Sequence, residues 1–212
     1  MTREPYPSPD FYAPLARIVD DEETVRNSES FTLRVAGIQT VVYESAEAFL
    51  EKDDLRHPGC VVLDVRMPGM SGLELQEEMT KRGIDLPILF ISGHGDIPMA
   101  VSALKRGAHD FCEKPVAPEK FRSAVREMIA ANIESRKAAI ESAEKRARFS
   151  TLTPREADIL KLVAGNLLNR EIAEKLGIQE HTVKIHRSNA CRKLGIRSAL
   201  EASNLLHEIG VL

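Results

Sequence analysis

The chain has 212 residues, of which 43% are hydrophobic and 29% charged, and its formal net charge at pH 7 is −3. That length allows one large or two ordinary domains with real hydrophobic cores, and no apolar run approaches the length of a membrane-spanning helix. The three cysteines are widely spaced, which argues against a disulfide framework or a zinc site and suits a reducing cytoplasm.

The first fourteen residues contain four prolines and lack the apolar stretch of a secretory signal peptide. We expect residues 1–14 to form a disordered or extended leader. The first domain is then predicted to begin with the strand at Leu15.

Short apolar runs that alternate with helical stretches predict an open parallel sheet. Asp20 and Asp21 follow the first of four such runs, Asp64 the second, Ser92 the third and Lys114 the fourth. The carboxyl ends of neighbouring parallel strands share one edge, where such proteins build their sites. The sequence therefore predicts that these five side chains meet. The four runs are Leu15–Val19, Cys60–Leu63, Ile88–Ile91 and Ala108–Cys112.

Carboxylates gathered at such an edge are typical of a magnesium-dependent pocket that accepts a phosphoryl group. A carboxylate nucleophile must approach an anionic phosphoryl group, and Mg²⁺ screens that repulsion. Asp64 is the candidate nucleophile, because it lies in the middle of the set after the most apolar run. Asp21 would hold the metal directly, Asp20 directly or through water, and the backbone carbonyl of Arg66 is a further candidate ligand.

A lysine and a hydroxyl complete the predicted pocket. Lys114 would pair with one phosphoryl oxygen, and the hydroxyl of Ser92 would donate a hydrogen bond to another. The alternative is a solvated cluster of charges, since carboxylates are common at strand ends. All five side chains standing at their respective strand ends favours the pocket.

A long helical stretch follows the predicted sheet. Pro118 opens it, and neither glycine nor proline interrupts Glu119–Phe149, which corresponds to a helix of roughly 45 Å. Ile133, Ile140 and Ala147 recur every seven residues, a weak coiled-coil pattern. Two interpretations stay open: a linker that reports the state of the first domain, or a charged helix that only spaces two domains.

A second domain begins at Thr153, a good N-cap, followed by Pro154 at the first helical position and by Glu156, which completes a capping box. We expect Asn169 to cap a later, short helix.

The spacing from Ala173 to Gly177 to Val183 is typical of a helix-turn-helix. A small residue lets two helices approach, a glycine makes the left-handed turn, and an aliphatic side chain anchors the following helix.

Net charge changes sign along the chain. Residues 1–131 contain 15 basic and 22 acidic side chains, whereas residues 132–150 contain 5 and 3 and residues 151–212 contain 9 and 7. An acidic part followed by a mildly basic one suits a switch attached to a domain that binds a polyanion.

The first part of the chain, from about Leu15 to Ala131, resembles the receiver domain of a bacterial response regulator of the FixJ/NarL type. The resemblance implies that a histidine kinase phosphorylates Asp64 and that Ser92 and Phe111 relay the change. It also implies a cis bond before Pro115, in line with cis peptides being mainly a proline phenomenon. The matching motifs are Val19-Asp20-Asp21, Leu63 to Gly69 with Ser71-Gly72, Ile91 to Asp96, and Asp110 to Pro115.

The last part, from Leu152 to Leu212, is similar to the LuxR/NarL-type DNA-binding domain. It matches at Asn169–Ala173, Leu176–Ile178, Thr182–Arg187 and Arg192–Leu194. The resemblance implies that Lys184, Ile185 and Ser188 face base edges and that Thr182, Arg187 and Arg192 reach phosphates. It further implies a dimer contact through the last helix, Ser198–Ile209.

Several positions depart from these patterns. Arg17 interrupts the first strand and Thr40 stands in the second, while Glu29 and Thr32 lie in the first helix, expected over Thr24–Val35. A buried unpaired charge is costly, so Glu29 should be paired or turned outward. In the second domain Gln179 stands where relatives commonly have a serine cap, a loss typically worth about 1 kcal/mol.

These features together predict an α/β doubly wound, five-stranded parallel-sheet receiver and a separate all-α helix-turn-helix domain, joined by a helical linker. We expect a leader over 1–14, the receiver over 15–131, the linker over 132–149 and the DNA-binding domain over 150–212. The predicted protein is a cytoplasmic response regulator that uses Mg²⁺ and has a cognate histidine kinase, promoter DNA and RNA polymerase as partners. Phosphorylation of Asp64 is expected to control homodimer formation and DNA binding.

Two other classes stay in view. A phosphohydrolase with an aspartyl-phosphate intermediate usually carries a second aspartate two residues after the nucleophile, and Arg66 stands there, so we expect no enzyme beyond slow self-dephosphorylation. The alternative is a phosphorylation-independent DNA-binding regulator with a degenerate receiver that acts as a scaffold. Arg17, Glu29 and Thr32 favour this alternative.

Overall fold

A computed structural model describes residues 12–93 and 97–212, without the side chains of residues 97–99 and 102. The chain divides into two compact units, one that ends at Lys137 and a second that runs from Ala138 to Leu212. The predicted leader lies outside the described residues up to residue 11, as does the His94-Gly95-Asp96 part of the motif after the third apolar run.

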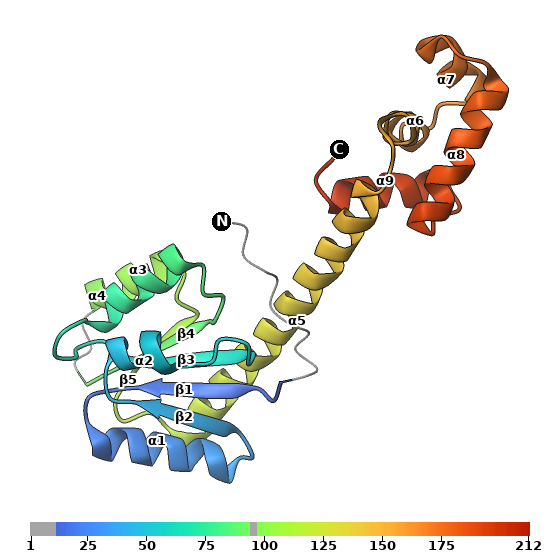
Figure 1. Cartoon of the computed structure of the whole chain (residues 1–212). Coiled ribbons are helices and arrows are strands. Elements are labelled where there is room, and N and C mark those ends of the chain that lie inside the picture. Colours follow the sequence, from blue (N-terminus) through green and yellow to red (C-terminus); the bar gives the residue numbers. More distant parts are fainter. Residues whose placement is uncertain (1–11, 94–96) are drawn as a thin grey trace. The chain divides into compact units, whose positions relative to one another are not determined.

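A five-stranded sheet forms the centre of the first unit (Figure 1). All four strand pairs are parallel, and the spatial order is β2-β1-β3-β4-β5. The predicted α/β fold class is thus confirmed. The strands are β1 (Leu15–Val19), β2 (Gln39–Tyr43), β3 (Gly59–Asp64), β4 (Ile88–Ser92) and β5 (Asp110–Glu113).

Helices cover both faces of this sheet (Figure 1), which is why the central strands β3 and β4 are buried along their whole lengths and apolar up to their last residues, Asp64 and Ser92. One core lies between the sheet, α1 (Glu23–Val35) and α5 (Pro118–Ser150). The other lies between the sheet, α2 (Ala46–Lys52), α3 (Gly72–Arg82) and α4 (Ile97–Lys105).

The last strand begins later than predicted, at Asp110 and not at Ala108. The preceding helix α4 is the reason, because the N–H of Ala108 still donates to the carbonyl of Ala103 at 3.1 Å. Gly107, at φ +91°, turns the chain there. The backbone thus closes the end of α4 before it joins the sheet.

The polar residues that depart from the receiver pattern are accommodated in different ways. Thr40 and Ser30 share a hydrogen bond of 2.8 Å between β2 and α1, and the hydroxyl of Thr32 donates to the carbonyl of Ser28 at 2.9 Å. Arg17 is fully buried and forms an ion pair with Asp53.

The second unit contains four short helices after the end of α5: α6 (Pro154–Ala164), α7 (Asn169–Leu176), α8 (Glu180–Leu194) and α9 (Ala199–Glu208). The capping box between Thr153 and Glu156 is present, and Gly177 adopts the left-handed conformation at φ +64°. Val183 is fully buried, so the predicted anchor of the helix-turn-helix is confirmed. Within the described residues, no helix is both long and apolar enough to cross a membrane.

The N-cap of α7 is Leu168, and the prediction that Asn169 caps this helix is wrong. Asn169 is the first helical residue, and its side-chain oxygen instead accepts a hydrogen bond from Nη1 of Arg187 at 2.9 Å. The N–H of Leu168 donates to the carboxylate of Glu171 at 2.7 Å. The side chain of Asn169 thus takes part in a contact between α7 and α8 and not in a local cap.

Candidate functional site

The predicted pocket residues stand at the carboxyl ends of four neighbouring strands. Asp20 follows β1, Asp64 ends β3, Ser92 ends β4 and Lys114 follows β5. Because β1, β3, β4 and β5 are consecutive in the sheet, one edge carries all four residues.

Lys114 joins two of the carboxylates. Its Nζ donates to Oδ2 of Asp20 at 2.6 Å and to Oδ1 of Asp64 at 2.8 Å. Burial opposes the charge of the ammonium group, yet these two hydrogen bonds raise the pKa of Lys114 to about 12. The lysine is therefore a permanent positive charge between the two aspartates at physiological pH.

Asp64 is held in place but remains within reach of solvent, with 10% of its side chain exposed. Its second oxygen, Oδ2, accepts the N–H of Arg66 at 2.7 Å. Gly72 allows the first turn of α3 to approach, since a Cβ atom at that position would lie 2.2 Å from the carbonyl oxygen of Asp64. Local backbone geometry thus fixes the carboxylate of Asp64 at the carboxyl edge of the sheet, within reach of solvent.

The candidate metal ligands are partly brought together. Asp20 is almost fully buried and accepts the N–H of Glu22 at 2.8 Å, while Asp21 is exposed. In the part of the chain that the structure describes, no three His, Cys, Asp or Glu side chains are grouped closely enough to hold a metal ion. The oxygen atoms of Asp20, Asp21, Asp64 and the carbonyl of Arg66 nevertheless fit Mg²⁺ in kind, because this ion prefers oxygen ligands and is commonly bound through carboxylates plus waters and phosphate oxygens.

The two predicted relay residues occupy different environments. Ser92 is buried, with 3% exposure, and its carbonyl accepts the N–H of Lys114 at 2.8 Å. Phe111 is half-buried and packs against the core that involves α2, α3 and α4. The structure therefore joins Ser92 to the pocket through the backbone of Lys114, and places Phe111 one strand position before Cys112 in β5.

One group near the site was not assigned to it from the sequence. Glu29 in α1 lines a cavity of about 330 Å³ together with Lys114, Ile91 and Phe121. Burial is the main cause that raises its pKa to about 7, while Lys114 opposes the shift and Asp20 and Asp64 add to it. The unusual acidic residue in the first helix was the only sequence signal, and its electrostatic link to the pocket required the tertiary structure.

The residues predicted to contact DNA all lie on α8. The helix buries Val183, Ala190 and Leu194, so its other faces are available to a ligand. Ile185 on this helix is 48% exposed. The remaining candidates differ in accessibility: Lys184 and Ser188 are exposed, whereas Thr182 and Arg187 are half-buried.

Existing contacts already orient some of these polar side chains. Lys184 pairs with Glu180 at 3.0 Å, one helical turn earlier. Arg187 donates to Asn169, and Arg192 donates to Oδ1 of Asn189 at 2.9 Å. As expected, Gln179 makes no side-chain capping hydrogen bond at the start of the helix.

Comparison with known proteins connects both units to characterised families. The family described as "Response regulator receiver domain" matches residues 16–126, and the family described as "Bacterial regulatory proteins, luxR family" matches residues 150–206. The first match includes the candidate pocket, and the second includes α8.

Relatives match over nearly the whole chain. Nodulation protein W of Bradyrhizobium diazoefficiens is 38% identical over 194 residues, which is 92% of this chain and 86% of that protein. Response regulator protein TmoT of Ectopseudomonas mendocina is 41% identical over 85% of this chain and 82% of its own length. The solved structure of the response regulator StyR matches with a TM-score of 0.83 and 41% identity, over 92% of this chain and 99% of that one. This chain belongs to the two-component response regulators of the FixJ/NarL type, transcriptional regulators in which a receiver domain precedes a LuxR-type DNA-binding domain.

Proposed function

We propose that Asp64 is the phosphoacceptor and that its phosphorylation by a cognate histidine kinase controls dimer formation and sequence-specific DNA binding. The observation that carries this proposal is the position of Lys114, which bridges Asp20 and Asp64 at the carboxyl edge of the sheet. A lysine shared between a candidate nucleophile and a candidate metal ligand is ready to neutralise an incoming phosphoryl group.

In the proposed transfer an oxygen of Asp64 forms a bond to phosphorus while the donor's bond to phosphorus breaks and the leaving group takes up a proton. Lys114 would exchange its hydrogen bond from Oδ1 of Asp64 to an oxygen of the transferred group. Ser92 would donate its hydroxyl to another of these oxygens after a local rearrangement, and Phe111 would move with it.

We assign Asp20, Asp21, Asp64 and the carbonyl of Arg66 as the groups that would hold Mg²⁺. The ion would supply positive charge that screens the repulsion between the carboxylate and the phosphoryl group. We also expect only slow self-dephosphorylation, because Arg66 stands where a phosphohydrolase would carry its second aspartate.

For the second unit we propose that α8 reads DNA in the major groove, with Lys184, Ile185 and Ser188 at base edges. Phosphates would be contacted by Thr182, Arg187 and Arg192. The exposure of the three side chains assigned to base edges supports this assignment.

The proposal also includes the domain limits, the partners and the cellular location of the protein. We assign 15–131 to the receiver, 132–149 to the linker and 150–212 to the DNA-binding domain, with 1–14 as a leader. Homodimers formed on activation would bind two half-sites and act on RNA polymerase. A cytoplasmic location agrees with the three free cysteines of the chain.

The direct test is to incubate the full chain with Mg²⁺ and a small-molecule phosphodonor and to measure its intact mass. We expect one added phosphoryl group in the natural sequence and none in Asp64→Asn. Asp54→Asn is the matched control, because this carboxylate lies before the opposite end of β3. Incorporation that persists in Asp64→Asn would contradict the site, and no incorporation in any sample would favour the phosphorylation-independent scaffold.

DNA reading is tested by Lys184→Ala on a DNA site selected in vitro with the full chain. Loss of a base contact should weaken specific binding by roughly 5- to 100-fold at physiological salt. Lys161→Ala removes the same charge from an exposed position of α6 and should change affinity by less than about twofold. Equal affinities for both variants would show that Lys184 does not face the bases.

A further inference from the structure

The loop Asp54–Pro58 leads into β3 at the amino edge of the sheet, opposite the candidate phosphoacceptor pocket. All five of its consecutive carbonyl oxygens accept hydrogen bonds from just two side chains, the guanidinium groups of Arg17 and Arg136. One arginine belongs to β1 and the other to α5. The loop is thus a common binding partner for a strand of the sheet and for the long helix.

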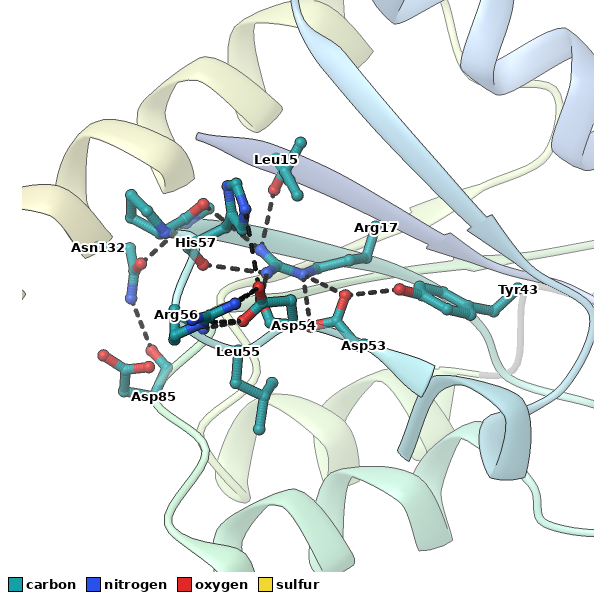
Figure 2. Close-up of polar contacts among 12 residues, drawn as sticks. Leu15, Arg17, Tyr43, Asp53, Asp54, Leu55, Arg56, His57, Asp85 and Asn132 are labelled. Carbon is teal, nitrogen blue, oxygen red and sulfur yellow. Dashed lines mark hydrogen bonds and ion pairs between the residues drawn. The ribbon is translucent and has the colours of Figure 1, made fainter. Parts of the chain in front are cut away.

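Arg17 holds the two ends of the loop. Its Nη2 donates to the carbonyls of Asp54 and His57, both at 3.0 Å, and its Nη1 donates to that of Pro58 at 3.4 Å (Figure 2). Its charge is balanced by Asp53 at 3.0 Å, which also accepts the hydroxyl of Tyr43 at 2.6 Å. The side chains of the ion pair are 0% and 2% exposed, so water does not compete for these bonds.

Arg136 of α5 holds the middle of the loop. Nη2 donates to the carbonyl of Leu55 at 3.1 Å and Nη1 to that of Arg56 at 3.0 Å. The same guanidinium forms a two-point contact with Asp85, through Nε at 2.8 Å and Nη2 at 2.7 Å. Such a paired contact fixes direction as well as distance, and the arginine side chain is only 1% exposed.

One turn earlier on α5, Asn132 adds a third connection. Its Oδ1 accepts the N–H of Gly59, the first residue of β3, and its Nδ2 donates to the carbonyl of Asp85, each at 2.9 Å (Figure 2). Gly59 is required here, because it adopts φ +149° and a Cβ atom would lie 1.9 Å from the carbonyl oxygen of Leu15. The start of β3 is therefore tied to α5 and pressed against β1.

We call this set the arginine bridge: Arg17, Asp53, the loop Asp54–Pro58, Asp85, Asn132 and Arg136. It grips the amino ends of β1 and β3, the two strands whose carboxyl ends lead to Asp20 and Asp64. It also grips α5 at Arg136, next to Lys137, the last residue of the first compact unit. The bridge thus touches both the strands of the phosphoacceptor pocket and the helix that continues into the second unit.

We propose that the arginine bridge is the device that couples the receiver to the linker, with Arg136 as the positioning residue on α5. Buried guanidinium groups without partners are costly, so a shift of β1 or β3 must either carry the loop and α5 along or leave donors and acceptors unpaired. The bridge thereby converts a change at the strands into a change in how α5 is held. This inference rests on the proposed phosphorylation of Asp64.

The test compares full-length variants by the ratio of their DNA dissociation constants without and with the phosphodonor, with phosphoryl incorporation measured by mass in the same samples. Arg136→Ala removes the grip on the loop, and Asp85→Asn weakens it while preserving shape. Arg126→Ala is the matched control, because this exposed arginine of the same helix donates to the carbonyl of Ala36, outside the loop Asp54–Pro58. Allosteric couplings typically correspond to 5- to 150-fold.

We expect Arg136→Ala to take up phosphoryl normally and to bind DNA as the unphosphorylated natural chain does, while its ratio falls at least about 5-fold. The ratio of dissociation constants should fall by a smaller factor in Asp85→Asn and should stay unchanged in Arg126→Ala. Circular dichroism checks the fold, and Asp85→Asn decides the outcome if Arg136→Ala does not fold.

Two results would overturn the inference: ratios within twofold of the natural chain in every folded bridge variant, or loss of phosphoryl incorporation in these variants. The first would show that the bridge does not transmit, and the second that it acts on the pocket itself. Failure of the natural chain to incorporate phosphoryl would refute the proposed function, and the inference with it, and the mass measurement separates that case from the other two.

Discussion

The two edges of the receiver sheet use similar chemical groups in opposite ways. At the carboxyl edge Lys114 pairs with Asp20 and Asp64, and 21% of the lysine side chain is exposed. At the amino edge Arg17 pairs with Asp53, and the arginine is fully enclosed. A cation beside an aspartate is thus partly open to solvent at one edge and enclosed at the other.

The difference lies in how many partners each cation has. The ammonium group of Lys114 carries three N–H donors and bonds to two carboxylates, those of Asp20 and Asp64. Arg17 directs its hydrogen bonds to Asp53 and to backbone carbonyls that cannot leave. Exposure and exchangeable partners suit a site that changes its ligands, whereas saturation by the backbone suits a fixed point of the fold.

The largest effect on stability is expected when the buried ion pair between Arg17 and Asp53 at the amino edge is removed. Arg17→Met leaves Asp53 buried with only Tyr43 as a hydrogen-bond donor among the contacts described above, and removing one partner of a buried ion pair typically costs about 3–5 kcal/mol. Chemical denaturation of the full chain, followed through the receiver transition, should show this loss. Arg56→Met is the control, since its pair with Asp54 is exposed and such pairs contribute less than about 1 kcal/mol. A comparable loss in both variants would contradict the contrast between the edges.

An effect on the rate of phosphoryl transfer is expected at the carboxyl edge, where Lys114 lies. Lys114→Met removes the positive charge beside Asp64, and loss of one preorganised charge of this kind slows a reaction by about 100-fold. The rate of phosphoryl incorporation from a small-molecule donor measures this effect. Lys120→Met, an exposed lysine in the first turns of α5, should retain the normal rate. An unchanged rate in Lys114→Met would remove the lysine from the proposed mechanism.

The smallest effect concerns Glu29 and depends on pH. Burial raises its pKa from 4.5 to about 7, so the folded receiver binds a proton more tightly than the unfolded chain. The associated stability is present below pH 4.5 and is lost as pH rises through 7. Glu29→Gln, which stays neutral, should therefore be more stable than the natural chain at pH 8 by roughly 1–2 kcal/mol, after allowance for partial exposure.

Calorimetry of the full chain without divalent metal, at pH 5 and pH 8, measures this difference. Glu23→Gln, at an exposed position in the first turn of the same helix, is the control and should show much less dependence. A Glu29→Gln variant with equal gains at both pH values would show that the carboxyl group does not titrate in this range.

The sequence was most informative where a simple geometric rule applies. Parallel strands end at a common edge, so Asp20, Asp64, Ser92 and Lys114 could be placed together from the ends of apolar runs alone. The capping box at Thr153 was equally accessible, because it involves residues within one helical turn. Asn169 shows the limit of such local rules, since α7 begins at this residue and its side chain bonds to Arg187 of α8.

No such rule predicted the arginine bridge. Arg17 was visible only as a charge within an apolar run, and its partner Asp53 lies 36 residues away. The pairing of Arg136 with Asp85 spans 51 residues. The same holds for Glu29, whose surroundings come from the packing of α1 against the sheet.

The amino-acid sequence by itself determined the carboxyl ends of the strands that carry the pocket, the capping box at Thr153 and the spacing of the helix-turn-helix, because these depend on short-range backbone geometry and on the periodicity of apolar residues. Only the tertiary structure decided which buried charges are paired, because the energy of a buried charge depends on partners that distant segments bring to it. In the loop Asp54–Pro58, for example, the backbone carbonyls bind Arg17 and Arg136, which come from distant segments of the chain.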